Sequence, residues 1–434
     1  MIINNLELVN FRCFENTSIK FNHDLTIIVG SNGAGKSSVL DAVAIAMGSF
    51  LAGIDGVQSN SISKDDVRFV SYEQGSVIDR QPQFPVKIQC EANIGTGENA
   101  VTWVRALNRK TGKTTIVDAK KIMNYADELQ QKVRRGDKDI ILPLLSYYGT
   151  GRLYAQKKKK RSSTSLQSDT KFAGYTDCLD LMSNEKLMLK WFEKMTLIEL
   201  QEKRDLPELR TVIGAIKKCL YGVLSENGDI KELNVFHEIK TSELTITYTD
   251  NHGELKKHPL RELSDGYKNT LSIIADIAYR MAVLNPQLLE NVVNMTPGVV
   301  LIDEIDLHLH PSWQKRIIND LRNIFPKVQF ILTTHSPSII GSVSNKHIII
   351  LKNNEAMYPL SSTYGRDVNS VLREIMGVSE RQQDIIDKFN AVYRLIDIEE
   401  YEKARYVLQE LEATIGTEDP EIAGANVTLK LESM

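Results

Sequence analysis

One glycine-rich stretch of this chain has the residue types that hold phosphate. Residues 30–37 read GSNGAGKS, which matches the spacing G-x-x-x-x-G-K-S. Backbone N–H groups of such a loop converge on phosphate oxygens, the Lys36 ammonium reaches the β- and γ-phosphates, and the Ser37 hydroxyl can ligate Mg²⁺. The pattern predicts a site for ATP and Mg²⁺. The predicted phosphate-binding residues are Asn32, Gly33, Ala34, Gly35, Lys36, Ser37 and Ser38.

Two carboxylates and a histidine follow other apolar segments of the chain. Residues 299–304 read VVLIDE, and residues 331–335 read ILTTH. We expect Asp303 to hold Mg²⁺ through water and Glu304 to orient and deprotonate the attacking water. His335 is expected to hydrogen-bond the γ-phosphate and to sense its loss. These side chains predict hydrolysis as well as binding of ATP.

The histidines of DLHLHP raise the alternative of a metal site. His308 and His310 lie two positions apart, and no cysteine is near them. A closed zinc site would need further cysteine or histidine ligands. The spacing therefore favours a loop that faces a second copy of the chain.

The residues with candidate chemistry follow segments that read as buried strands. Apolar runs without alternation predict strands at 25–30, 298–304, 328–337 and 346–353, and a helix is predicted from Lys36 to Phe50. Other predicted elements are strands at 2–9, 17–21 and 139–149, a hairpin of 86–94 and 100–107, strand alternation over 230–250, and helices over 176–222, 266–285, 311–325 and from 365 onward.

A polar turn precedes the predicted helix 266–285. Residues 260–269 read LRELSDGYKN, which places a serine and a glycine at the start of that helix. A hydroxyl, free amides and the positive end of a helix together bind anions. An ordinary serine N-cap explains the same residues, so both interpretations stay open on this stretch alone.

In their order along the chain, these motifs resemble those of the ABC-type ATPases. They correspond to Walker A, a signature loop, Walker B with an adjacent glutamate, and a switch histidine. The family signature LSGGQ reads LSDGY here, from Leu263 to Tyr267. The resemblance implies that Ser264 and Gly266 cap the γ-phosphate of ATP held by a second copy. Asp265 and Tyr267 depart from the pattern, and a carboxylate beside that phosphate is unfavourable unless it is turned away.

Longer stretches are similar to the RecF/SMC/OLD branch of that superfamily. They are NFRCF, SNGAGKSS and DEIDLHLHP, and the resemblance places Arg12 near the nucleotide. YYGTGRLY and SNEKLMLKWFEKM look most like PtuA, the ATPase family of the Septu antiphage defence system. The resemblance implies an α/β fold: an ABC-type P-loop ATPase head with mixed sheets, a helical insertion and a helical C-terminal tail. It also implies a homo-oligomer, at least a dimer through the heads, whose closure regulates an HNH nuclease, PtuB.

The same resemblance divides the chain into four parts. They are an N-terminal ATPase lobe (1–155), a mostly helical insertion (156–229), a C-terminal ATPase lobe (230–360) and a helical tail (361–434). The family's Q-loop has two candidate places, Gln74 and residues 146–152. Residues 354–434 lack a Gly-x-Asp or Asp-x-Asp pattern on an apolar strand, so the Toprim nuclease of OLD-type relatives is not expected there.

Composition limits the other possibilities. The chain has 434 residues, a formal net charge of −3, and four widely spaced cysteines. It lacks a signal-peptide pattern and an apolar run near the ~18 residues of a membrane helix, so a cytoplasmic protein without membrane contact is expected. DNA is a possible partner only through a local basic patch such as Lys157–Arg161 or Arg134–Arg135. The alternatives are therefore a stand-alone DNA-repair ATPase and an ATP-binding scaffold with little turnover.

Overall fold

The computed structural model divides the chain into two compact units, Met1–Arg366 and Asp367–Met434. It describes residues 1–74, 77–95, 100–153, 170–180, 185–224 and 230–433. The basic run Lys157–Arg161, predicted as a possible DNA-binding patch, lies outside these ranges. Within them, no helix is long and apolar enough to cross a bilayer.

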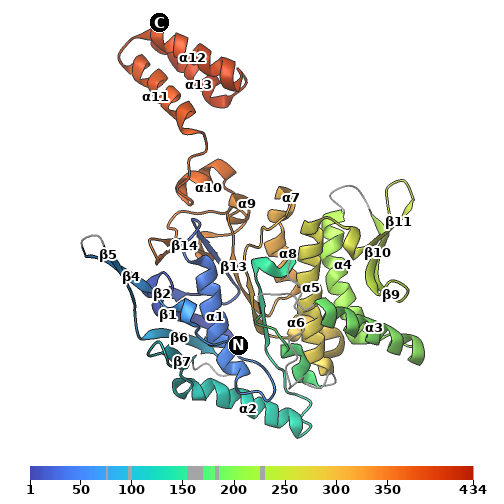
Figure 1. Cartoon of the computed structure of the whole chain (residues 1–434). Coiled ribbons are helices and arrows are strands. Elements are labelled where there is room, and N and C mark those ends of the chain that lie inside the picture. The colour runs from blue at the N-terminus through green and yellow to red at the C-terminus, as the bar shows by residue number, and fades with distance from the viewer. Residues whose placement is uncertain (75–76, 96–99, 154–169, 181–184, 225–229, 434) are drawn as a thin grey trace. The chain divides into compact units, whose positions relative to one another are not determined.

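A mixed central sheet forms the middle of the larger unit (Figure 1). Its strands are parallel except for the last pair, β14 and β15, which is antiparallel. In spatial order they are β15 (Glu355–Met357), β14 (Ile348–Lys352), β3 (Leu25–Gly30), β13 (Val328–Thr333), β12 (Gly298–Ile302) and β8 (Leu144–Tyr148).

The apolar runs of the sequence occupy the centre of this sheet. Every residue of β8, β12 and β13 is buried, as expected for strands covered on both faces. Figure 1 shows helix α1 (Lys36–Leu51) and helix α5 (Asp265–Leu284) on opposite sides of the sheet. Because the strands are parallel, the loops after β3, β12 and β13 open at one edge, where ligands bind in sheets of this kind.

An antiparallel sheet packs beside the central one. It confirms the predicted N-terminal strands and the predicted hairpin, and Gln329 of β13 joins the two sheets through hydrogen bonds to both the N–H and the C=O of Ile3. Its spatial order is β2 (Phe14–Lys20), β1 (Ile2–Phe11), β6 (Val86–Asn93) and β7 (Ala100–Leu107). The strands β4 (Phe69–Gln74) and β5 (Val77–Pro82) form a separate hairpin, and β9 (Lys231–Glu238), β10 (Glu243–Thr249) and β11 (Leu255–Pro259) form a third sheet.

Helices cover the remaining parts of the larger unit. The segment predicted as helical over 176–222 contains two helices. The second begins at Pro207, because proline fits the first turn of a helix but disrupts a helix interior. The helix predicted over 311–325 is also two. The helices are α2 (Lys120–Arg134), α3 (Glu185–Glu202), α4 (Pro207–Leu224), α6 (Val292–Met295), α7 (Pro311–Gln314), α8 (Ile317–Ile324) and α9 (Pro337–Ile340).

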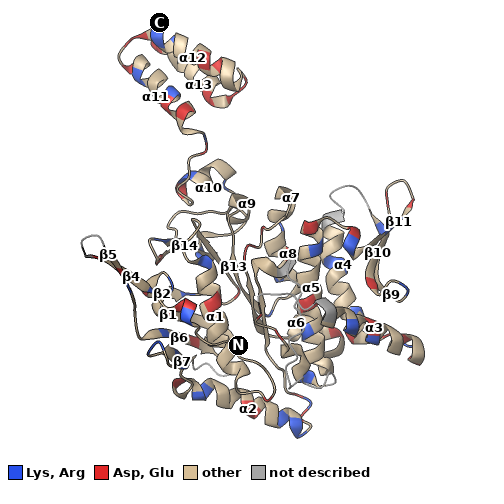
Figure 2. Cartoon of the chain, in the orientation of Figure 1, with Lys and Arg blue, Asp and Glu red and all other residues tan. Residues whose placement is uncertain are grey.

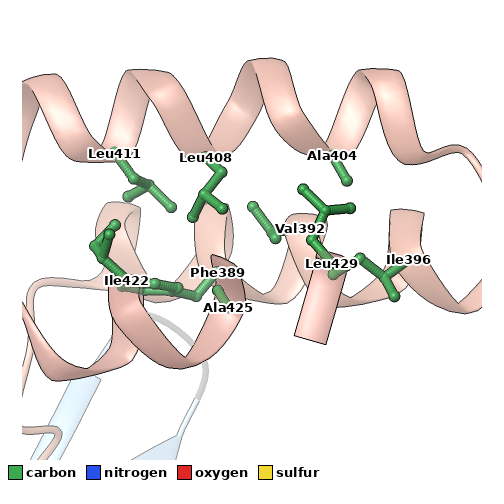
Figure 3. Close-up of a cluster of buried hydrophobic side chains, with 9 residues drawn as sticks. All are labelled: Phe389, Val392, Ile396, Ala404, Leu408, Leu411, Ile422, Ala425 and Leu429. Carbon is green, nitrogen blue, oxygen red and sulfur yellow. The ribbon is translucent and has the colours of Figure 1, made fainter. Parts of the chain in front are cut away.

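The smaller unit has a hydrophobic core of its own (Figure 3). That core includes Phe389, Val392 and Ile396, so these apolar side chains of α11 pack within their own unit. The helices are α10 (Val368–Glu374), α11 (Gln383–Asp397), α12 (Tyr401–Ile415) and α13 (Pro420–Glu432).

The two units differ in net charge. Residues 367–434 hold 15 acidic and seven basic side chains, a net charge of −8, and Figure 2 shows both kinds spread over α11–α13. The remaining 366 residues hold 46 basic and 41 acidic side chains, a net charge of +5. The near-neutral charge of the whole chain therefore describes neither unit.

Candidate nucleotide-binding site

The phosphate loop joins β3 to α1 through two glycines in the left-handed region. Gly33 has a φ of 81° and Gly35 a φ of 96°, which side chains with a Cβ rarely adopt. A Cβ on Gly35 would also lie 2.6 Å from Phe14 Cζ and 2.7 Å from Cys13 Sγ. The loop conformation therefore requires glycine at position 35. Asn32 and Gly33 are exposed, and Ala34 and Ser38 are half-buried.

The Lys36 ammonium lies across this loop. It donates to the carbonyl oxygens of Gly30 (2.9 Å) and Ser31 (3.0 Å), although the residue is buried. Burial lowers the pKa of Lys36, and the carboxylates of Asp303, Glu304 and Asp306 oppose that shift. The three carboxylates thus favour the charged form of Lys36, at the place where a polyphosphate would need a cation.

Ser37 and Asp303 meet although 266 positions separate them in the chain. Ser37 Oγ donates to Asp303 Oδ2 at 2.8 Å, and Thr333 Oγ1 of β13 donates to Asp303 Oδ1 at 2.6 Å. A hydroxyl and a carboxylate are oxygen ligands of the kind Mg²⁺ prefers, and Mg²⁺ at such sites completes its shell with water and phosphate. The donor set therefore fits the predicted ion.

Glu304 stands in a strained backbone conformation directly after β12. Its φ is 48°, and its N–H donates to Thr333 Oγ1 at 2.8 Å. A non-glycine residue in this region is uncommon and occurs most often where function requires a fixed direction. Thr333 therefore fixes both acids, the Asp303 side chain and the Glu304 backbone. Thr333 lies two positions before His335 on the same predicted strand, but no local sequence pattern marks it as part of the site.

His335 lies at the end of β13 next to a third acid. Its backbone N–H and the Thr334 hydroxyl both donate to Asp306 Oδ1, at 3.3 Å and 2.6 Å. The histidine is half-buried. Asp306 was not singled out from the sequence either, and it ties the loop after β12 to the loop after β13.

One of the other two histidines of this region has a structural role. His310 caps α7, since its ring nitrogen Nδ1 lies 2.8 Å from Ser312 Oγ and accepts from the Ser312 N–H. His308 is exposed, with a φ of 62°. Over the described residues, no group of three or more His, Cys, Asp or Glu side chains could hold a metal ion.

Arg12 lies on the flank of the phosphate loop. Its guanidinium contacts Asp41 of α1 at 2.5 Å and Asp66 at 2.9 Å, and NH1 lies 3.5 Å from Ser38 Oγ. Burial opposes the charge, but the two carboxylates outweigh it and raise the pKa of Arg12. A cavity of about 420 Å³ adjoins this cluster and extends along α1 past Ala44.

The turn before α5 does not behave as an ordinary serine cap. Ser264 occupies the N-cap position and is exposed, but its side chain makes no capping hydrogen bond. Gly266 packs so closely on the loop after Walker B that a Cβ there would lie 2.3 Å from the His308 carbonyl oxygen. The turn is therefore held by packing, and the Ser264 hydroxyl is not needed as a cap.

Both departures from the family signature have contacts that the sequence could not show. The Asp265 carboxylate lies 3.4 Å from the Lys268 ammonium, one turn along α5. The Tyr267 ring packs on Trp313 of α7, with 4.9 Å between ring centroids. Tyr267 thus fills a packing position on this chain.

The candidate Q-loop region 146–152 begins inside β8, which lies beside Walker B strand β12. Gln74 belongs instead to the β4–β5 hairpin, and its side chain lies outside the described part of the structure. The residues after β8 are therefore the better placed of the two.

The chain is similar to several known proteins. A family model described as "AAA domain" matches residues 5–220, and one described as "AAA domain, putative AbiEii toxin, Type IV TA system" matches residues 223–341. The Retron Ec83 probable ATPase of Escherichia coli is 28% identical, over 98% of this chain and 85% of that protein. The Septu protein PtuA of Bacillus thuringiensis is 23% identical, over 97% and 96%. The SMC head domain from Thermotoga maritima superposes with a TM-score of 0.45 at 16% identity, over 83% of this chain and 100% of that domain.

The fold, the loop order and the sequence matches define an ABC-type P-loop ATPase of the RecF/SMC/OLD branch. Within that branch the chain is PtuA-like, as its sequence resemblance indicated, and it is similar over nearly its whole length to ATPases of the Septu and retron type.

Proposed function

We propose that the chain binds ATP with Mg²⁺ at the loop between β3 and α1 and hydrolyses it. The observation that carries the proposal is the convergence of Lys36, Ser37 and Asp303 at one edge of the sheet. Lys36 would hold the β- and γ-phosphates, and Ser37 and Asp303 would hold the ion, Asp303 through water. Bound there, Mg²⁺ would neutralise the charge that develops on the phosphate oxygens during hydrolysis.

Glu304 is the proposed general base. Its backbone is fixed by Thr333, so the carboxylate projects from a defined position at the strand end. It would accept a proton from the water that attacks the γ-phosphate. His335, on the adjacent strand end, would hydrogen-bond the γ-phosphate and lose that partner after hydrolysis.

Closure of two copies around the nucleotide is the second part of the proposal. Ser264 and Gly266 would contact the γ-phosphate held by the other copy, where the exposed hydroxyl and the start of α5 favour an anion. The contact of Asp265 with Lys268 supports this role, because it offsets the like charge of that carboxylate.

The output of closure is proposed to be control of a separate HNH nuclease in antiphage defence. Similarity to the Septu proteins PtuA supports this part. A nucleotide can shift a partner's activity only if the partner prefers one of the two states of the heads. Co-purification with an HNH nuclease encoded by a neighbouring gene tests it. Failure to bind such a nuclease, combined with ATP-dependent binding to DNA ends, would favour the DNA-repair alternative.

Lys36→Ala tests the nucleotide site itself. Charge-assisted hydrogen bonds contribute about 1.5–3 kcal/mol each, so ATP affinity should fall by a factor of about 100 or more. Calorimetry on folded protein measures this, with Lys132→Ala, an exposed lysine of α2, as the matched control. If folded Lys36→Ala bound ATP with unchanged affinity, the loop between β3 and α1 would not be the ATP site.

A further inference from the structure

The β4–β5 hairpin stands apart from the sheets of the larger unit. Figure 1 shows it extending from one side of that unit, and among the described strands neither β4 nor β5 joins a third strand. Phe69, Tyr72 and Ile78 are exposed on it. A two-stranded hairpin by itself is at best marginally stable in water. A partner surface that covers one of its faces would therefore stabilise it.

One face of the hairpin combines apolar side chains with charges of both signs. In the antiparallel register Ile78 lies opposite Glu73, and Phe69 shares their face because it is four positions from Glu73. The Arg80 guanidinium lies over the Phe69 ring, 5.3 Å from its centroid. We call these four side chains the hairpin face. It places an acid beside an isoleucine and a base beside a phenylalanine.

The hairpin begins at the flank of the proposed nucleotide site. The Asp66 carbonyl oxygen accepts from the Arg12 N–H at 2.8 Å, and the Arg68 N–H donates to the Asn10 carbonyl oxygen at 3.0 Å. Arg12 also contacts the Asp66 carboxylate and approaches Ser38. Each strand of the hairpin has six residues, which in extended conformation span about 20 Å. The hairpin is therefore long enough to reach a second protein that covers the nucleotide.

The third sheet, formed by β9, β10 and β11, has one buried and one exposed face. The side chains of the buried face are Val235, His237, Leu244 and Ile246. Three threonines of β10, at the alternate positions 245, 247 and 249, share the other face. Their partners in the neighbouring strands are Phe236, Lys257 and Leu255. We call these three partners the sheet face.

The sheet face resembles the hairpin face in composition but differs in its charge. Phe236 and Leu255 are exposed, and the Lys257 ammonium lies 6.0 Å from the centroid of the Phe236 ring. Lys257 is two positions from Leu255 on the same side of β11, so a base accompanies the aliphatic side chain here. In the hairpin an acid, Glu73, accompanies Ile78. The two faces are therefore complementary in charge and alike in apolar character.

The proposed closure of two heads brings these faces together. Strand β11 ends at Pro259, five positions before Ser264. If Ser264 of one copy contacts the phosphate held by the other, the third sheet of the first copy lies beside the flank from which the other copy's hairpin extends. Figure 1 shows the hairpin and the third sheet on opposite sides of the larger unit. They can therefore meet between two copies but not within one chain.

We propose that the hairpin face docks on the sheet face of a second copy when ATP closes the two heads. The inference rests on the proposed function, since it requires closure. Ile78 and Leu255 lose exposed apolar surface in the contact, and Glu73 lies near Lys257 of the other copy. A two-fold pair of heads makes the contact twice. Nucleic acid is a poorer occupant, because residues 69–82 hold two acids and one base, a net charge of −1.

Ile78→Glu tests the contact. It removes the apolar side chain, so ATP-dependent association, measured by light scattering, should weaken by at least about tenfold. ATP affinity should be unchanged by calorimetry in a Ser264→Arg background, where two copies are kept apart. Val117→Glu is the matched control, because Val117 and Ile78 are both 68% exposed. Val117 precedes α2, which Figure 1 shows at the opposite end of the larger unit from α7 and α9.

A charge exchange separates loss of contact from loss of folding. Leu255→Lys added to Ile78→Glu should restore much of the association, because the new charges attract each other across the interface. Leu255→Glu added to Ile78→Glu should weaken association further, because like charges repel each other. Equal association of the two double variants would show that the hairpin and the third sheet do not meet.

Crosslinking identifies the occupant directly. A photoreactive phenylalanine analogue at position 69 of the full chain should attach to residues 231–259 of another copy, and only with ATP–Mg²⁺. Attachment to nucleic acid, to a nuclease or to another part of the second copy would overturn the inference and leave the proposed function standing. If ATP caused no association of wild-type heads, the closure proposal and this inference would both be wrong.

Discussion

At the scale of single residues, Thr333 holds two neighbouring acids in different ways, which suits the different tasks proposed for them. One hydroxyl oxygen donates to the Asp303 side chain and accepts the Glu304 N–H. The Asp303 side chain thereby lies against Ser37. At Glu304 the positive φ changes the direction of the backbone, so that the two side chains leave the strand end differently. The proposed ion-binding acid and the proposed base are distinguished by backbone geometry.

Glu304→Gln is predicted to separate binding from turnover. The amide keeps the size and hydrogen-bonding capacity of the carboxylate but cannot accept a proton. ATP affinity should be unchanged, and the turnover rate should fall by about 10²–10⁴, the usual contribution of a general base. Phosphate release at saturating ATP, with calorimetry on the same sample, measures both quantities. Wild-type turnover in this variant would assign the base to another residue.

For single residues, the sequence predicted the phosphate-loop motif well but gave no sign of the contacts between distant positions. The spacing of Lys36 and Ser37 is local, so the loop was recognisable without coordinates. The contacts of Asp303 with Ser37 and of Asp41 with Tyr147 join positions 266 and 106 apart, and no local pattern encodes them.

At the scale of elements, the signature turn places a serine at the N-cap position of α5 without the hydrogen bond that a capping serine makes. A serine that caps a helix contributes about 1 kcal/mol. Ser264 makes no such bond, whereas Ser336, the N-cap of α9, accepts from the Ile339 N–H at 3.2 Å. The two serines therefore offer a direct comparison on one protein.

Ser264→Ala is accordingly predicted to leave stability almost unchanged and to weaken ATP-dependent association of two heads. Ser336→Ala, the comparison, should lower the free energy of unfolding by at least about 1 kcal/mol, because it removes the cap and also the hydrogen bond from Ser336 Oγ to Gln314 Oε1. Denaturant titration gives the stabilities, and light scattering with and without ATP–Mg²⁺ gives association. The opposite result would be a Ser264→Ala protein that is less stable by about 1 kcal/mol but associates normally. That result would show that Ser264 is an ordinary N-cap.

Elements with strong patterns were predicted well. The strand at 25–30 has the predicted bounds, and the helix predicted from Lys36 to Phe50 ends one residue later. Helix α2 was missed, because its buried face is narrow and includes Gln130. The β4–β5 hairpin was missed as well, since its exposed Phe69, Tyr72 and Ile78 break the alternation expected of a half-buried strand.

At the scale of the whole molecule, the separate core of residues 367–434 predicts that the larger unit works without it. A chain ending at Arg366 should bind ATP as the full chain does, because every residue of the candidate site lies in the larger unit. It should lose the partner nuclease if the helices provide the docking surface. Calorimetry checks the first outcome, and co-purification checks the second. Retained nuclease binding by the folded shorter chain would remove the helical unit from that interface.

A point variant gives the same comparison without truncation. Leu408 is buried in the helical core, so Leu408→Ala should destabilise that unit by about 2–5 kcal/mol. Leu431 of α13 is 67% exposed and supplies the matched control. Loss of ATP binding in Leu408→Ala, with Leu431→Ala unaffected, would contradict independence of the two units.

The opposite net charges of the two units mean that dissolved salt should act on them in different ways. Like charges within residues 367–434 repel one another, and added ions screen that repulsion, so the acidic helices gain stability as ionic strength rises. The larger unit carries a net positive charge, which favours the approach of a polyanion. The same ions weaken that attraction and slow the arrival of ATP. A buffer chosen to favour one unit therefore works against the other.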